Sequence, residues 1–192
     1  MNQILEWLST GDLRSDCLAD QVVDFVLDNP AAFIDLYDGL STADDVVRGH
    51  AADALEKIAR RKPELYSDRL QEIITRLKDD PLPMVRWHLA MMLGHLAFYE
   101  EQVDEISKAL LESLKDESVF VKSWVIVSLC IVGRLYPLRR EEITAAITPL
   151  HIDTGIAIRS KVRKAMNILM DQNTPFPGGW VKSEQILQLM NR

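Results

Sequence analysis

Three histidines, His50, His88 and His95, have the clearest capacity for chemistry, because imidazole can bind a metal ion or transfer a proton near neutral pH. His88 and His95 are seven positions apart, so on one helix roughly 10.5 Å separates them along the axis. That separation is too large for two ligands of one ion. Histidines at half-buried helix positions usually serve as polar filler. We therefore expect no metal, no other cofactor and no catalytic residue.

Nothing else in the chain indicates an enzyme. Cys17 and Cys130 lie far apart within apolar helical patterns, which favours buried thiols in a reducing compartment over a disulfide. Neither has the basic surroundings of a reactive thiol, and there is no phosphate-binding loop or nucleophile elbow. No signal peptide opens the chain, and its most apolar window, residues 123–133, is too short to cross a bilayer. We expect a cytoplasmic protein without a membrane segment.

A second group of residues is suited to binding. Aromatic residues and methionine gather on the outward faces of two central predicted helices, which is typical of a groove for a peptide or helix. The alternative is that neighbouring helices or a terminus cover these faces. We predict a protein partner here. The predicted contact residues are Trp87, His88, Met91, His95 and Trp124, with His50 and Lys161 on the rim.

These residues belong to a pattern that recurs about every 37 positions. A valine or isoleucine precedes a basic residue, and apolar residues follow that base after three, seven and ten places. The basic residues are Arg48, Arg86, Lys122 and Arg159, separated by 38, 36 and 37 positions. Such a period predicts stacked helical pairs. The first helices are expected near 30–40, 66–78, 101–115 and 139–150, and the second near 44–61, 83–98, 118–135 and 155–171. No useful alternating strand pattern occurs, so the predicted fold is all-α.

Acidic residues recur along the chain with the same period as the basic residues. Six positions before the base stand Asp80, Asp116 and Asp153, whereas the first repeat has Thr42 there. An acid in the turn and a base at the start of the following helix can join neighbouring repeats through charge-assisted hydrogen bonds. The turns also contain helix-start residues and breakers: Ser41-Thr42, Asp80-Pro81, Glu117-Ser118 and Asp153-Thr154-Gly155.

The turn aspartate, the Val-Arg pair and the apolar spacing resemble HEAT repeats, in particular the short bacterial type similar to the phycobilisome-lyase group, over about residues 30–172. The resemblance implies a right-handed α-α superhelix of four helical-hairpin repeats, with second helices on the concave side. It also implies that the four basic residues are structural. We read residues 1–29 as an N-terminal cap, with helices near 2–10 and 12–28. Residues 173–192 then form a C-terminal cap with a last helix from Ser183, or a tail that docks onto a neighbour or into the groove. One domain would span 1–192.

The net charge of −7 is unevenly distributed. Residues 1–117 contain 24 acidic and 12 basic side chains, whereas residues 118–192 contain 5 acidic and 10 basic ones. A basic run, Arg159, Lys161, Arg163 and Lys164, offers an alternative function, a nucleic-acid-binding or DNA-repair-like HEAT protein. Acidic flanking repeats argue against it, since duplex DNA is bound through many phosphate contacts. A homodimer through the apolar face is a third alternative. We predict a non-catalytic protein-binding module: an adaptor, inhibitor or assembly factor.

Overall fold

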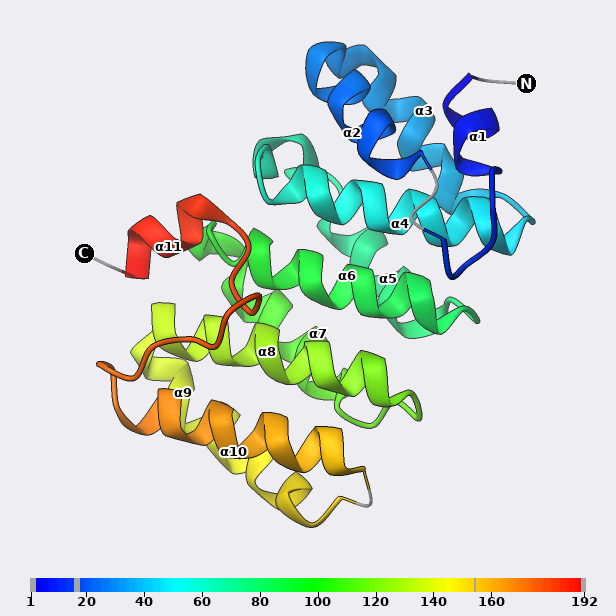
Figure 1. The fold of residues 1–192 in the computed structure, drawn as a ribbon. Helices are drawn as coiled ribbons and strands as arrows, with labels where there is room; N and C mark the ends of the chain where they lie inside the picture. The colour runs from blue at the N-terminus through cyan, green and yellow to red at the C-terminus, as the bar shows by residue number, and fades with distance from the viewer. Residues whose placement is uncertain (1–2, 16–17, 154, 191–192) are drawn as a thin grey trace.

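The computed structural model describes residues 3–15, 18–153 and 155–190 (Figure 1). Within these ranges the regular elements are eleven α-helices and six short 3-10 helices, with no strand, so the all-α prediction is confirmed. None of these helices combines the length and the apolar character needed to cross a lipid bilayer. Cys17 and Thr154, which the sequence analysis assigned to a helix and a turn, lie outside the described residues.

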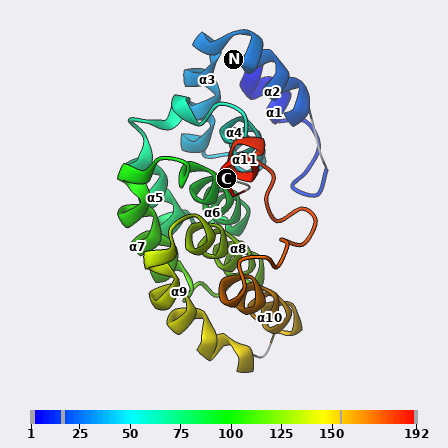
Figure 2. The ribbon, with the colours of Figure 1, turned by 90° about the vertical axis from the view of Figure 1, so that its left-hand side faces the viewer.

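Four long helices lie side by side, and each packs on the next along the chain. They are α4 (Asp45–Ala59), α6 (Pro83–Leu96), α8 (Val119–Leu135) and α10 (Ile156–Met170). We call them the long-helix layer. Figure 2 shows a second layer of shorter helices on one side of it. These are α5 (Leu70–Asp79), α7 (Val103–Ser113) and α9 (Arg140–Ile147). The long-helix layer agrees with the four predicted second helices, and α5, α7 and α9 agree with the last three of the four predicted first helices, apart from a few residues at their ends.

The remaining helices lie at the two ends of the chain. They are α1 (Gln3–Leu8), α2 (Ala19–Asp28), α3 (Phe33–Asp38) and α11 (Glu184–Met190). The helix expected over 12–28 begins only at Ala19. Before it, Ser15 Oγ donates to the Asp12 carbonyl at 2.8 Å, and the Arg14 amide donates to Asp12 Oδ1 at 2.8 Å. These local bonds favour a turn over a helix. Residues 9–15 therefore form an N-terminal loop.

The apolar positions of the repeat pattern face inward. In the three repeats whose bases are Arg48, Arg86 and Lys122, all the positions three, seven and ten places after the base are buried. In the last repeat Met166 is only partly buried. The buried apolar side chains form one cluster that includes Ile4 near the start of the chain and Ile186 near its end. The period therefore marks the side of each helix that packs on its neighbours.

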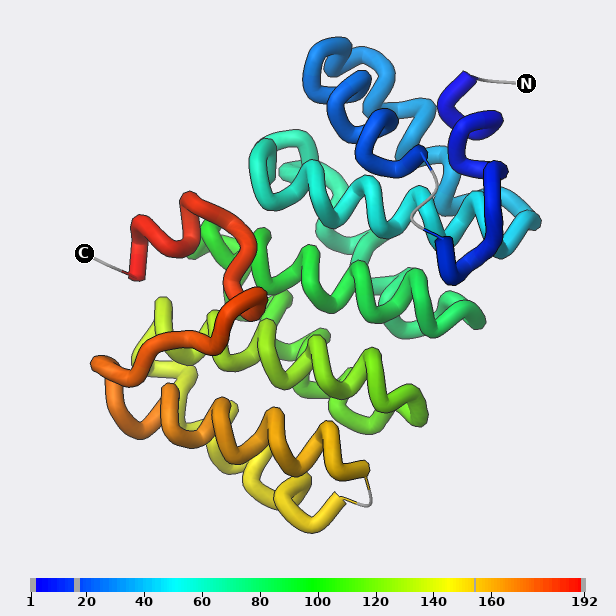
Figure 3. Tube along the Cα trace, viewed as in Figure 1, coloured from blue at the N-terminus to red at the C-terminus, as the bar shows by residue number. Residues whose placement is uncertain are grey.

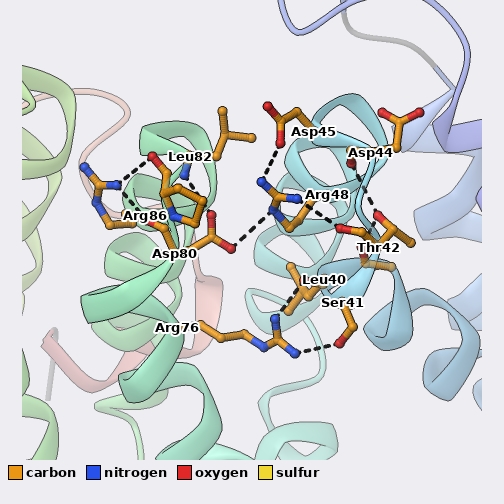
Figure 4. A network of polar contacts seen from close by, with 12 residues as sticks. Leu40, Ser41, Thr42, Asp44, Asp45, Arg48, Arg76, Asp80, Leu82 and Arg86 are labelled. Carbon is orange, nitrogen blue, oxygen red and sulfur yellow. Dashed lines mark hydrogen bonds and ion pairs between the residues drawn. The ribbon is translucent and has the colours of Figure 1, made fainter.

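The acidic and basic columns join successive repeats. Arg86 Nε lies 2.7 Å from Asp116 Oδ2, and Lys122 Nζ lies 3.0 Å from Asp153 Oδ2. In the first repeat Arg48 Nε lies 3.4 Å from Asp80 Oδ2 (Figure 4). Each base thus reaches the turn aspartate of the following repeat, as the sequence predicted. We call these three ion pairs the ladder.

The arginines of the pattern also bind their own turns. Arg48 Nη1 donates to the Thr42 carbonyl at 2.9 Å, and Arg86 Nη1 donates to the Asp80 carbonyl at 2.7 Å (Figure 4). Arg159 Nη1 donates to the Asp153 carbonyl at 2.7 Å. In each case the acceptor lies six positions before the arginine. These bonds satisfy turn carbonyls that have no partner in regular structure.

Both ends of the chain return to one side of the long-helix layer. After α10 the backbone turns back and passes over α8 before it reaches α11 (Figure 3). Figure 2 shows this C-terminal segment, residues 171–183, and the N-terminal loop on the side away from α5, α7 and α9. The predicted binding residues lie on helices of this layer, so the two segments decide how much of them remains accessible.

Candidate functional site

The indole of Trp124, on α8, lies where the long-helix layer meets the C-terminal segment. Lys161 Nζ from α10 is 4.9 Å from the centroid of that indole, and Lys182 Nζ from the C-terminal segment is 5.1 Å from it. Lys161 Nζ is also 4.7 Å from the ring centroid of Trp180. These distances are typical of cation–π contacts. Two helices and the C-terminal segment thus form one lysine–tryptophan cluster: Trp124, Lys161, Trp180 and Lys182.

Trp180 covers part of the predicted partner surface. Only 5% of it is exposed, and it borders a small void together with Met91 and His95 of α6 and Trp124 of α8. The C-terminal segment therefore packs across α8 toward α6, and its contacts are not confined to the last repeat. The sequence analysis named coverage by a terminus as the alternative to partner binding on the apolar helix faces, and Trp180 provides such coverage in part.

Arg134 at the end of α8 fastens the start of this segment. Its guanidinium donates to the carbonyls of Gln172 at 2.6 Å and Thr174 at 2.8 Å. The same group lies 5.3 Å from the ring centroid of Phe176. Because these acceptors are main-chain groups, the bonds fix the path of the backbone regardless of the side chains there.

An open pocket of about 380 Å³ remains between the N-terminal loop and the C-terminal segment. Its walls include Arg14 of the loop, Trp87 and Met91 of α6, Trp124 of α8, and Lys182. Next to it, Phe120 at the start of α8 has its ring centroid 5.2 Å from that of Trp87, with the two rings tilted, and 63% of Phe120 is exposed. The pocket thus combines aromatic surface with cationic groups from both ends of the chain.

The histidines His50 and His88 are held by bonds within the fold. His50 is 1% exposed, and its Nδ1 and Nε2 lie 2.8 Å and 3.1 Å from the carbonyl oxygens of Leu8 and Asp12. It connects the N-terminal loop to α4. His88 is buried, and its Nδ1 lies 2.9 Å from the carbonyl oxygen of Met84, within α6. Both imidazoles line the pocket as buried groups held in place by these bonds.

The third histidine belongs to a buried charged group. His95 Nε2 lies 2.8 Å from Glu56 Oε1, and Arg60 forms an ion pair with the same carboxylate. Burial alone would raise the pKa of Glu56, but the hydrogen bonds from His95 and Arg60 outweigh it and lower that pKa from 4.5 to about 2. The carboxylate is thus ionised inside the core, where it links α4 to α6.

A second charged group lies at the pocket wall. Lys57 Nζ is 2.9 Å from Asp53 Oδ2 and 2.7 Å from Asp20 Oδ1. Burial raises the pKa of Asp53, but the contacts with His88 and Lys57 more than offset this and lower it overall. Lys57 is thus neutralised by two carboxylates and is not available to a ligand as an unpaired charge.

Two features of the described residues bear on reactive chemistry. Burial raises the pKa of the Cys130 thiol to about 12, so this group stays protonated near neutral pH and is a poor nucleophile. Within the described ranges, no group of three or more His, Cys, Asp and Glu side chains is arranged to hold a metal ion.

The predicted site residues therefore occupy three kinds of position. Trp87, Met91, Trp124 and the buried His50 and His88 line the pocket, and Lys161 adjoins it through the cluster. His95 lies beneath, beside the small void under Trp180. Sequence reasoning did not select Arg14, Phe120, Trp180 and Lys182. Of these, the sequence pointed weakly to Lys182 alone, because it is a basic residue two places after a tryptophan in a stretch rich in proline and glycine. No spacing rule places that stretch against α8.

No protein-family model matches the sequence, and no curated protein matches it either.

Proposed function

We propose that the protein is a non-catalytic protein-binding module, an adaptor, inhibitor or assembly factor, built as a HEAT-like right-handed superhelix. Three observations support this architecture: the repeat period near 37, the sequential packing of α4, α6, α8 and α10, and the ladder between successive repeats. In this proposal residues 30–172 are four repeats, and residues 1–29 and 173–192 are caps. The protein acts in the cytoplasm as one domain.

The observation that carries the binding function is the open pocket between the two termini. Trp87 and Trp124 are only partly buried there, and Phe120 beside them is mostly exposed. Partly exposed aromatic side chains beside a pocket are the residue types that dominate binding energy at protein interfaces. The proposed contact surface is therefore Trp87, Met91, Trp124 and Phe120, with Lys161 at its edge. His50 and His88 line the same pocket as buried groups, and His95 lies beneath this surface.

The nucleic-acid alternative draws less support from the same geometry. Within the basic run, Lys161 lies against two indoles and Arg159 binds the Asp153 carbonyl. This leaves Arg163 and Lys164 as the exposed bases of that helix without a described ion pair. Two such bases are few for a ligand whose affinity depends on many phosphate contacts.

A pull-down from the native lysate tests the proposal. The bait is the full chain, compared with Trp87→Ala/Phe120→Ala and with the control Ile34→Ala/Leu138→Ala, which removes exposed apolar residues elsewhere. We expect a protein that the wild type and the control capture and the first variant loses. Phe120→Asp, at a mostly exposed position, repeats the test should Trp87→Ala unfold the chain by circular dichroism.

Two results would contradict the proposal. If both Phe120 variants fold and capture the same proteins as the wild type, the contact surface is wrong. If light scattering shows a dimer that Phe120→Asp dissociates, and no other protein is captured, the surface is a contact between copies.

A further inference from the structure

Lys161 and Lys182 have no anionic partner of their own. In the described part of the chain neither ammonium group forms an ion pair; both contact the indole of Trp124 instead. A cation on an indole face is stabilised, but its charge is not neutralised. The cluster therefore presents positive charge that no direct ion pair neutralises, on the face that we propose binds a partner.

The surroundings of the two lysines increase this positive potential. Burial lowers the pKa of Lys161, and the nearby charges of Lys164 and Lys182 lower it further. Burial and the nearby charge of Arg60 also lower the pKa of Lys182, and the charges of Glu56 and Asp53 offset this only in part. An anion placed between Lys161 and Lys182 would relieve their mutual repulsion and favour the charged form of both.

A third unpaired cation lies across the pocket. Arg14 of the N-terminal loop is exposed, and within the described residues its guanidinium forms no ion pair. The other two cations of the pocket, Lys57 and Arg60, already pair with carboxylates. Two of the unpaired charges thus line the pocket, Arg14 on the N-terminal loop and Lys182 on the C-terminal segment.

Between these charges the pocket wall is partly apolar and partly polar. Met84, Trp87, Met91 and Trp124 contribute to its walls, and its volume of about 380 Å³ suits one bulky side chain with part of its backbone. A ligand that fits this arrangement carries an apolar group flanked by negative charges. The ligand also carries only a few negative charges, because residues 1–117 are strongly acidic and would repel a long polyanion.

We infer that the pocket and the lysine–tryptophan cluster together bind an acidic segment of a protein partner. In this inference a bulky apolar side chain of the partner enters between Trp87 and Trp124. Carboxylates on either side of that side chain meet Lys161 and Lys182 at one edge and Arg14 at the other. The inference rests on the proposed function and adds the chemistry of the partner.

Fluorescence anisotropy with synthetic peptides tests the inference on the full chain. The probes are labelled peptides in which two glutamates flank a phenylalanine or leucine at several spacings, each with a matched peptide carrying glutamines. The variant is Lys161→Gln/Lys182→Gln. The control, Lys108→Gln/Lys115→Gln, removes two exposed lysines from α7 and the turn after it.

We expect at least one glutamate peptide to bind the wild type about tenfold or more tightly than its glutamine counterpart at low salt. The Lys161→Gln/Lys182→Gln variant should lose about tenfold or more in affinity, and the lysine control should bind like the wild type. Equal binding of the paired peptides, equal binding by the variant, or no binding of any glutamate peptide would each overturn the inference. Preferential binding of a short DNA duplex, lost in the same variant, would overturn it in favour of nucleic acid.

The pull-down separates this inference from the proposed function. If Trp87→Ala/Phe120→Ala loses a partner that Lys161→Gln/Lys182→Gln retains, partner binding stands and the acidic segment is refuted. Suppose that binding of the glutamate peptides requires Lys161 and Lys182, but that capture of no protein requires Phe120. The anion site then stands, and the proposed partner surface is refuted.

Discussion

His95 Nε2 lies 2.8 Å from Glu56 Oε1, and the two residues are only 3% and 0% exposed. They come from α6 and α4, 39 positions apart, in successive repeats. A buried carboxylate is stable only when it is paired and hydrogen-bonded, and here His95 and Arg60 meet that need. A charged group thus connects two repeats inside the core, beneath the surface that we propose for binding.

Removing Glu56, His95 or Arg60 should lower the free energy of unfolding more than removing an exposed charged side chain does. For Glu56→Ala we expect a loss of about 3 to 5 kcal/mol in the free energy of unfolding, because His95 and Arg60 would remain without the carboxylate. Chemical denaturation measures the loss. The control Glu141→Gln changes an exposed residue on α9 and should stay within about 0.5 kcal/mol of the wild type. Similar stability of both variants would show that the buried pair contributes little.

The same carboxylate should make stability depend on pH in the acidic range. Its pKa is about 2 in the folded chain and 4.5 as an ordinary glutamate, so the folded form holds its proton less tightly. The resulting stabilisation is fully present above pH 4.5 and is lost as pH falls toward 2. Urea denaturation at several pH values should show the wild type losing more stability over this window than Glu56→Gln. Parallel profiles would contradict the assignment.

The ladder can be tested by a double-mutant cycle. Arg86 and Asp116 belong to successive repeats, 2.7 Å apart and mostly withdrawn from solvent. For Arg86→Met and Asp116→Asn we expect a coupling energy of about 1 to 3 kcal/mol. The exposed pair Lys62–Glu64, at 3.7 Å, is the control, and its coupling should be about 0 to 1 kcal/mol. Equal coupling energies in both pairs would show that the Arg86–Asp116 ion pair stabilises the fold no more than an exposed ion pair does.

A close contact between α6 and α8 depends on a glycine. A Cβ on Gly94 would stand 2.6 Å from Ser128 Oγ and 3.2 Å from Ser128 Cα. Since the backbone of α8 is that close, Gly94→Ala should destabilise the protein by about 1 to 3 kcal/mol despite the higher helix propensity of alanine. Gly178→Ala is the control, because nothing lies within 4 Å of a Cβ there. Thermal unfolding of both variants measures the effect. A Gly94→Ala variant as stable as the wild type would refute the close packing.

Docking of the C-terminal segment should depend on Trp180. Replacing it by alanine removes a buried indole and one contact of Lys161, which we expect to cost about 3 to 5 kcal/mol of the free energy that holds the segment down. Hydrogen exchange should then accelerate in residues 173–183, while α4 remains protected. Leu187→Ala, at a partly exposed position on α11, should leave exchange in that segment unchanged. Unaltered exchange after Trp180→Ala would show that other contacts hold it.

The sequence by itself determined the helices and their order. Apolar positions three, seven and ten places after each base are local information, and each helix of the long-helix layer packs on the next. The ladder was predictable for the same reason, since Asp116 and Asp153 keep a fixed distance from the bases. The start of α2 was not, because Asp12 and Ser15 bond to each other and form a turn where the apolar pattern favoured a helix.

Only the tertiary structure decided which predicted site residues remain accessible. His50, His95 and Trp87 were all predicted contact residues, yet the two histidines are buried whereas Trp87 is half-buried at the open pocket. The difference arises from the N-terminal loop, which bonds to His50, and from Trp180, which packs near His95. Both segments lie outside the repeats, so no period relates them to the helices they cover. Their positions follow from long-range packing, which brings Lys182 to Trp124 across more than fifty residues of chain.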